Sequence, residues 1–230
     1  LLAEVPPAEP SGFAGEKQMV TRCFWLFSSA ASGRADDEST FAAFDDMIEG
    51  SPDRFGVASI CGFAATTAIA IGDWEHAGRY ADLSRSVDPD AQFTFWNGQA
   101  LMQCGVVRAL RGDVDGGIEA FESGRSTYTT IGGRSALPTF QASLAMSLAT
   151  HDDLAGAERF VADARRDLDT IGEMWNAPVV LMAEGVVAGR CGDRERAAAA
   201  FAEAAAVAEE QGSHRLAERA RRLAAGAGTI

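Results

Sequence analysis

The chain has 230 residues, 47% of them hydrophobic, and its 20 basic and 33 acidic residues give a net charge of −13. A nucleic-acid-binding surface needs a stripe of basic residues that displaces phosphate counterions, so this acidic balance excludes direct binding of DNA or RNA. The four cysteines stand far apart, without a CxxC pair, which is typical of reduced thiols in a cytoplasmic protein.

The N-terminal part begins with residues 1–12, which contain three prolines and are predicted to form an irregular entry segment. Residues 13–230 are then expected to form a single domain. The segment FGVASICGFAATTAIAIG (residues 55–72) carries no charge over 18 residues, the length of a short membrane span. Its Gly, Ser and Thr content makes it only weakly apolar, and we interpret it as a core helix rather than a membrane segment.

Apolar residues recur at helical spacing along the chain and strand-like alternation is absent, which predicts an all-α fold. Long helices are expected at 15–31, 54–71, 93–111, 135–150 and 174–191. Each is expected to be followed by a second helix, at 37–49, 74–86, 114–130, 153–170 and 194–210. A last helix, about 213–226, would cap the stack with its arginines on an outward polar face. These arginines are Arg215, Arg219, Arg221 and Arg222.

A turn signal recurs between the two helices of a pair, as GDWE, GDVD, HDDL and GDRE. Its aspartates, Asp73, Asp113, Asp152 and Asp193, are separated by 40, 39 and 41 residues, with His151 in place of the glycine in the third turn. Glycine can close one helix in the left-handed conformation, and the aspartate can cap the next one. Gly132, Gly172 and Gly212 mark a second turn in antiphase, and Pro138 and Pro178 keep the same step of 40. The chain is therefore predicted to contain about five helix pairs with a period of about 40 residues.

Small and large residues also keep fixed places relative to these turns. Gly105 and Gly185 stand seven residues before a turn glycine. Small residues follow each turn at Ala77, Gly117, Gly156 and Ala197, and aromatic residues follow at Phe121, Phe160 and Phe201. Small residues facing large ones allow helices to pack closely. The spacing matches the tetratricopeptide pattern and predicts a right-handed superhelix.

Three passages carry a more specific resemblance: TIGGRSALPTFQASLAMSLATHDDLAGAERFV (130–161), TIGEMWNAPVVLMAEGVV (170–187) and AEEQGSHRLAERARRLAA (208–225). They resemble the degenerate tetratricopeptide-like C-terminal region of bacterial signal-transduction ATPases, including LuxR- or MalT-type regulators, and of class III adenylate cyclases. The resemblance covers about residues 92–225, although the Arg that this group usually carries in the helix after Trp175 is missing. It implies a non-catalytic segment of a larger bacterial signalling or transcription-regulatory protein.

The motifs of catalysis are absent from the sequence. It has no GxxxxGK[ST] loop and no GxSxG turn, and its three histidines stand without partners at metal-ligand spacing. The acidic clusters are explained by helix capping and solvation. We therefore expect no enzymatic activity, no cofactor and no metal site.

Two sets of residues are candidates for binding. The long helices are expected to line a concave face with Ser59, Gly62, Thr66, Gln99, Met102, Val106, Gln141, Ala145, Met182 and Val186. Two Trp-Asn pairs, Trp96-Asn97 and Trp175-Asn176, each begin a long helix and would project from one rim as recognition residues. Ordinary packing between helices is the competing interpretation of both sets.

Two functions follow from this sequence. The first is a protein-interaction or ligand-sensing helical repeat, whose partner is another protein, a neighbouring domain of the parent protein or a small apolar ligand. The alternative is a self-association module that forms a homodimer through an exposed apolar edge.

Overall fold

The computed structural model describes residues 13–226, with side chains from Lys17 onward. Within this range all regular structure is helical, as predicted. The helices in chain order are α1 (Phe13–Ser32), α2 (Asp37–Glu49), α3 (Arg54–Ile71), α4 (Trp74–Ser86), α5 (Thr94–Leu110), α6 (Val114–Thr130), α7 (Leu137–Thr150), α8 (Leu154–Ile171), the 3₁₀ helix η1 (Met174–Asn176), α9 (Ala177–Arg190), α10 (Arg194–Glu210) and α11 (His214–Ala224). The predicted entry segment, residues 1–12, lies outside the described residues.

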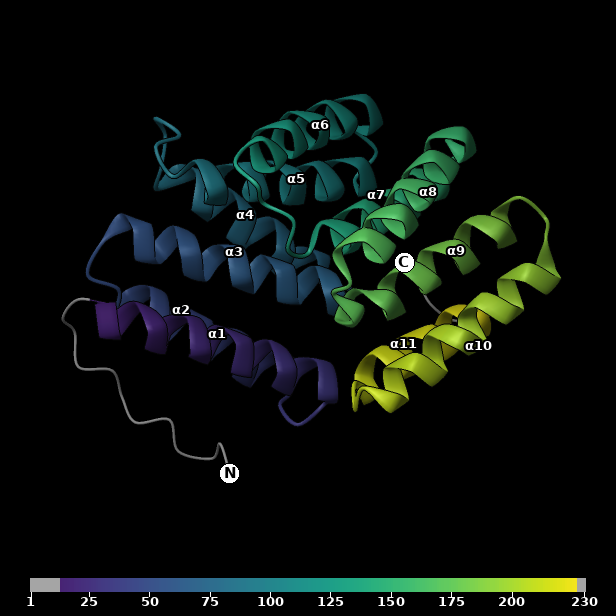
Figure 1. Ribbon diagram of the computed structural model, residues 1–230, viewed down its shortest axis with the longest axis horizontal. Coiled ribbons are helices and arrows are strands. Elements are labelled where there is room, and N and C mark those ends of the chain that lie inside the picture. Colours follow the sequence, from purple (N-terminus) through teal and green to yellow (C-terminus); the bar gives the residue numbers. More distant parts are fainter. Residues whose placement is uncertain (1–12, 227–230) are drawn as a thin grey trace.

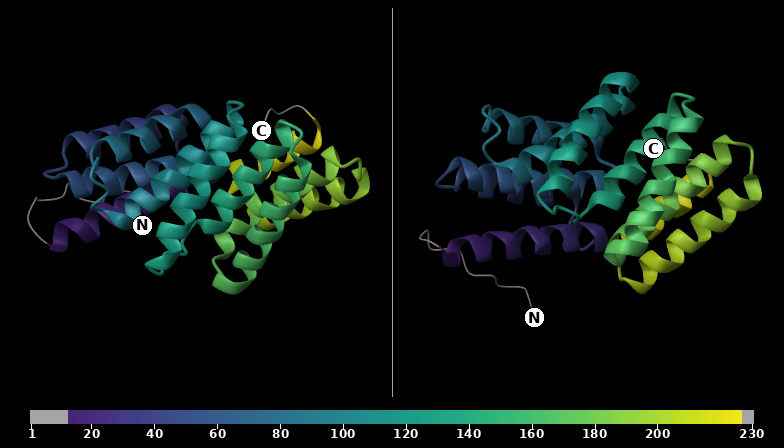
Figure 2. Two further views of the ribbon diagram at one scale, coloured as in Figure 1. Left: turned by 90° about the horizontal axis from the view of Figure 1, so that it is seen from above. Right: turned by 45° about the horizontal axis from the view of Figure 1, so that its top comes forward.

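Consecutive helices pack as antiparallel pairs that follow one another across the molecule (Figure 1, Figure 2). The closest pairings join α3 to α4, α5 to α6, α7 to α8 and α9 to α10. The first helix of each pair also packs on the first helix of the next, as α3 does on α5, α5 on α7 and α7 on α9. The buried core therefore runs between the odd-numbered helices and also takes in residues of the even-numbered ones, such as Tyr80, Phe121 and Phe160.

The turn between the two helices of a pair is stabilised by helix capping. The carboxylates of Asp73, Asp113 and Asp193 accept a hydrogen bond from the backbone N–H three residues later, which satisfies one free donor of the helix that follows. Gly72, Gly112 and Gly192, directly before them, have φ values of 85°, 97° and 87°. This left-handed conformation suits glycine and closes the preceding helix.

The third turn differs from the sequence prediction. Asp153, and not Asp152, caps α8 by accepting from the N–H of Gly156 at 3.0 Å. Asp152 has a φ of 64° and takes the place of the turn glycine, which had been assigned to His151. The small residue that follows this turn is accordingly the buried Ala157 and not Gly156. Aspartate tolerates the left-handed region because its short polar side chain bonds locally, which explains why glycine is dispensable here.

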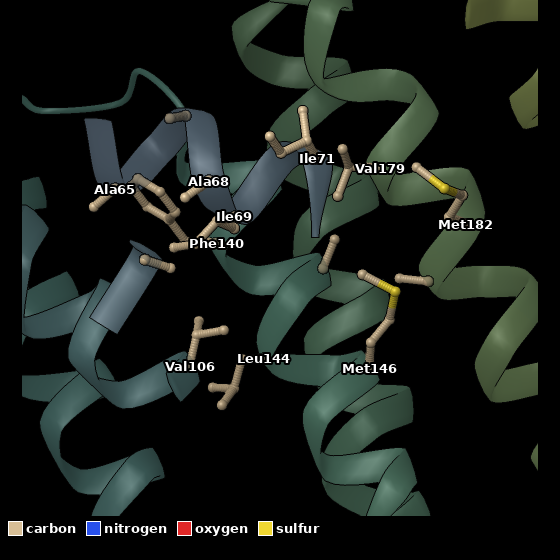
Figure 3. Close-up of a cluster of buried hydrophobic side chains, with 14 of the residues drawn as sticks. Ala65, Ala68, Ile69, Ile71, Val106, Phe140, Leu144, Met146, Val179 and Met182 are labelled. Carbon is tan, nitrogen blue, oxygen red and sulfur yellow. The ribbon is translucent and has the colours of Figure 1, made fainter. Parts of the chain in front are cut away.

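Figure 3 shows part of the core between the odd-numbered helices, where alanine, aliphatic and methionine side chains surround the ring of Phe140. Ile69 of α3, Val106 of α5 and Phe140 of α7 are fully buried there. Met182 of α9 is fully buried as well. The uncharged segment predicted to be a core helix is α3, and 78% of it is buried. It is also the one helix among the described residues long and apolar enough to cross a membrane.

Helices α5 and α6 approach each other closely because glycines face each other at their contact. A Cβ added at Gly117 would lie 2.7 Å from the backbone nitrogen of Ala109, and one at Gly105 would lie 2.6 Å from the carbonyl oxygen of Gly117. Gly98 and Gly124 make a second contact of the same kind. Side chains at these places would force the two backbones apart.

Helix α11 packs on α9, α10, α1 and α3 and leaves its other face exposed (Figure 1). Arg219, predicted to face outward, is only 4% exposed, and its Nη1 donates to the carbonyl oxygens of Ile69 and Ala70. These carbonyls belong to the last turn of α3, where a helix has acceptors without partners in the helix. Arg215 also turns toward the first helices and pairs with Asp37 of α2. Arg221 and Arg222 remain exposed, as expected.

Candidate ligand-binding site

A pocket of about 390 Å³ opens between α1, α3, α5, the segment before α7 and η1. Its lining residues are Phe24, Phe27, Ser28, Phe63, Thr66, Phe95, Trp96, Gln99, Ser135, Ala136 and Trp175. Six of these are aromatic and none is charged. A pocket of this size, mostly apolar and with few polar groups, has the features of small-molecule sites.

The aromatic side chains of the pocket contact one another across helices. The Phe24 ring meets Phe63 edge to face at 5.1 Å between centroids, and Phe63 packs on Trp96 at 5.7 Å. On the other side, Phe27 meets Trp175 edge to face at 5.0 Å. Such ring pairs hold their partners in defined orientations. Helix α1 is thereby joined to α3 by one pair and to η1 by the other.

Gln99 is the buried amide of the pocket wall. It is 5% exposed, and its Oε1 has no hydrogen-bond partner. A buried polar atom without a partner costs about 1–3 kcal/mol, so a group that reaches it would relieve this cost. Gly62 leaves the room for this arrangement, since a Cβ there would lie 2.6 Å from Trp96 and 2.7 Å from Gln99 Oε1.

Thr66 belongs to the wall but is already satisfied. Its Oγ1 donates to the carbonyl of Gly62 at 2.8 Å and accepts from Gln103 Nε2 at 3.1 Å. Gln103 is fully buried beneath the pocket. Hydrogen bonds from within the core therefore hold Thr66 in place, while Gln99 Oε1 remains able to accept a hydrogen bond from a ligand.

Glu173 lies just outside the lining. Its Oε2 accepts from the backbone N–H of Ala136, a lining residue, at 3.3 Å, and from Asn176 Nδ2 at 3.4 Å. Among the described residues no basic side chain forms an ion pair with it. The Glu173 carboxylate therefore places a negative charge beside the pocket lining, and within the described part of the chain no basic side chain pairs with it.

The predicted concave-face residues separate into two groups. Gln99 and Thr66 both line the pocket. Met102, Val106 and Met182 are instead fully buried in the core, out of reach of any ligand. The reason is that the odd-numbered helices pack directly on one another, so positions expected to line an open face are covered by the next helix.

Gln141 and Val186 also belong to packing. Gln141 is fully buried and donates from Nε2 to Asp167 of α8 at 2.8 Å. Val186 is half-buried against the core. Neither residue is among those that line the pocket.

In the two predicted rim pairs, the tryptophans line the pocket and the asparagines do not. Trp96 and Trp175 both line the pocket, so the structure brings these two predicted residues together at one site. Asn97 is half-exposed and lies outside the lining. Asn176 is fully buried, accepts from Thr139 Oγ1 at 2.6 Å and donates to the carbonyl of Glu173 at 2.9 Å. Asn176 therefore anchors η1 to α7 and does not project from a rim.

Sequence reasoning missed the contribution of α1. Phe24 and Phe27 enter the pocket from the segment CFWLF, whose density of aromatic residues was the available signal. Phe24 is 54% exposed, which is unusual for so large an apolar side chain. This segment lies outside residues 92–225, which carry the resemblance.

The titratable groups of the described residues do not form a second site. The described residues contain no cluster of three or more His, Cys, Asp or Glu side chains suited to a metal ion. Burial raises the pKa of the Cys23 and Cys61 thiols to about 12 and that of Cys104 to about 11. Thiols with such pKa values are protonated and unreactive near neutral pH.

The fold and the pocket define an all-α protein with an aromatic pocket, and comparison with known proteins adds no family to this description. The chain matches no protein-family model. A search of curated proteins likewise finds no match.

Proposed function

We propose that this chain is a ligand-sensing domain that binds a small, largely apolar molecule in the aromatic pocket. The observation that carries the proposal is the pocket itself, a cavity of about 390 Å³ with Gln99 Oε1 unpartnered in its wall. Ordinary core packing leaves few such spaces, and those that remain are usually functional.

The architecture we propose is a right-handed superhelix of tetratricopeptide-like pairs. The regular positions of the capping residues Asp73, Asp113, Asp153 and Asp193, now 40 residues apart in every case, support it. By the resemblance stated above, the domain would serve a larger signalling or transcription-regulatory protein of the bacterial cytoplasm, without catalysis of its own.

Sensing would work through α1. A ligand in the pocket touches α1 on one side and α5 and η1 on the other, so it would change how firmly α1 is held. Helix α1 also packs on α11 at the far end of the chain. Because a ligand shifts an equilibrium only by its differential affinity, this mechanism requires α1 to take two positions that bind the ligand with different affinity.

The test is a titration with the neutral fluorescent probe N-phenyl-1-naphthylamine, read by probe emission and by quenching of Trp96 and Trp175. We expect saturable binding at one site. Ser28→Phe fills the pocket from its exposed edge and should weaken binding at least about tenfold, which corresponds to about 1.4 kcal/mol. Ser123→Phe, on the exposed face of α6, is the matched control and should bind as the parent does. Binding that does not saturate, or that Ser28→Phe leaves unchanged, would refute the proposal.

Self-association is the second candidate, favoured by exposed apolar side chains near the pocket mouth. Phe24 is 54% exposed, Trp25 38% and Met174 56%. Light scattering between low and high protein concentration tests it, with Trp25→Glu as the disrupting variant. A strict monomer at all concentrations would remove this candidate.

A further inference from the structure

We propose that the ligand of this pocket is a lipophilic cation, a substituted ammonium group carrying an aromatic or short aliphatic tail. This inference rests on the proposed function and specifies its ligand class. Three observations carry it: the aromatic wall, the distribution of charge around the pocket, and the free amide of Gln99.

The wall is suited to a cation because aromatic faces carry negative potential. An ammonium group within about 6 Å of a ring centroid is attracted by the ring quadrupole, most strongly by tryptophan. Trp96 and Trp175 stand on separate segments of the pocket, and Phe24, Phe27 and Phe63 fill the wall between them. Several rings converging on one space form the arrangement that recognises substituted ammonium groups.

The charges around the pocket favour the same class. An anion would have no basic lining residue to pair with, and burying an unpaired charge is costly. A cation would instead have the Glu173 carboxylate beside the wall and a protein of net charge −13 around it. Both fields attract a positive ligand and repel a negative one.

Three basic residues stand close in sequence to the lining residues, and none of them lines the pocket. Arg134 precedes Ser135, is exposed, and donates from Nη1 to the carbonyl of Gly133. Arg22 is two residues from Phe24 and therefore lies on another face of α1. Lys17 is exposed and stands two turns from Phe24, about 10 Å along the helix axis, which is close to one Debye length in physiological salt.

Gln99 supplies the polar contact. Its amide can rotate to offer Oε1 to an N–H of a protonated amine or to a polarised C–H beside a quaternary nitrogen. An amide accepts such a group without the desolvation penalty that a buried carboxylate would bring. The pocket is thus able to hold positive charge without a buried counter-ion, and Glu173 supplies attraction from outside.

The decisive experiment compares two molecules of the same shape and different charge. Benzyltrimethylammonium and neopentylbenzene differ by a nitrogen cation in place of a carbon atom. We expect the cation to bind about ten times more tightly, a difference of about 1.4 kcal/mol, by isothermal titration calorimetry and by displacement of N-phenyl-1-naphthylamine.

Variants separate the contributions of the rings and of the charge. Trp96→Leu and Trp175→Leu should lower affinity for the cation more than for neopentylbenzene, and the Phe variants at the same positions should keep part of the difference. Trp25→Leu, outside the lining, is the control. Glu173→Gln should lower the affinity for the cation two- to fivefold and leave the affinity for neopentylbenzene unchanged. Glu195→Gln removes the same charge at the exposed start of α10 and should change neither affinity.

The outcomes distinguish this inference from the proposed function. Equal affinity for the two molecules, or tighter binding of neopentylbenzene, would refute the inference that the ligand is a cation. The proposed function would then stand with a neutral apolar ligand. An equal loss of both affinities in the tryptophan variants would also overturn it. Failure of every probe, N-phenyl-1-naphthylamine included, would overturn the proposed function as well.

Discussion

Arg219 of α11 donates a hydrogen bond of 2.8 Å from Nη1 to the carbonyl oxygen of Ala70 in α3, across 149 positions of the sequence. Its guanidinium also lies against Gly72, where an added Cβ would be 3.0 Å from Nε. Burial lowers the pKa of Arg219 to about 10. The bond joins the last helix to the turn between α3 and α4, so the end of the chain is held against its first third.

Loss of this arginine is expected to destabilise the whole fold. Arg219→Ala removes the donor to two helix-terminal carbonyls and leaves a void, and should lower the free energy of unfolding by about 3 kcal/mol in urea denaturation. Arg222→Ala removes only an exposed ion pair with Glu218 and should change it by less than about 0.5 kcal/mol. Similar small effects of both substitutions would show that α11 is not held by Arg219.

Gly117 at the contact between α5 and α6 and Gly189 on α9 are predicted to respond in opposite ways to substitution by alanine. Gly117→Ala places a methyl group 2.7 Å from a backbone nitrogen and should destabilise by about 1–3 kcal/mol. Gly189→Ala in α9 meets only Ala197 Cβ at 3.6 Å, so the gain in helix propensity should stabilise by up to about 1 kcal/mol. Thermal melts of the two variants check both signs, and a stabilising Gly117→Ala would contradict the close approach.

In the turn before α8, Asp153 is expected to contribute more to stability than Asp152. Asp153→Ala loses the side-chain cap and should cost about 1 kcal/mol. Asp152→Gly should change stability by less than about 0.5 kcal/mol, because relief at its positive φ offsets the greater flexibility of the unfolded chain. Chemical denaturation compares the two. The reverse order of effects would assign the cap to Asp152.

The raised pKa values of the buried thiols predict that the folded protein loses stability at alkaline pH. Cys23 and Cys61 have a pKa near 12 in the fold and ionise near 9 in the unfolded chain, so both states hold the proton below pH 9. Between pH 9 and 12 only the folded state holds it, and each thiol lowers stability by about 1.4 kcal/mol per pH unit within that window. Urea titrations from pH 7 to 10.5 should show a decline that becomes shallower in Cys61→Ala, and an unchanged slope would contradict the shift.

Thiol reagents offer an independent check on the same residues. At pH 8 only the exposed Cys191 should react with a disulfide reagent in the folded protein, because Cys23, Cys61 and Cys104 are buried. All four should react in urea. Rapid modification of a second thiol in the folded state would show that the core opens there.

The helices themselves could be predicted from the sequence, and their observed ends agree with the expected ones within three residues. Helix boundaries depend on neighbours within about one turn, such as Asp113 after Gly112, so the signal is local. The third turn was misassigned because Asp152 and Asp153 are adjacent and either can cap. The structure distinguishes them by the φ of Asp152 and by the hydrogen bond that Asp153 accepts from Gly156.

The candidate site could be predicted only in part. Trp96, Trp175 and Gln99 were chosen from their positions on the long helices and do meet at the pocket. Met102, Val106 and Met182 were chosen by the same rule and are core residues, because periodicity identifies an inward position without saying whether another helix covers it.

By itself, the sequence determined the helical class, the positions of the turns and the capping aspartates Asp73, Asp113 and Asp193, since those depend on interactions between near neighbours. Only the tertiary structure decided that Phe27 of α1 meets Trp175 and that Arg219 reaches the end of α3. These contacts join segments about 150 residues apart, and they depend on how distant helices are placed relative to one another, which no local pattern records.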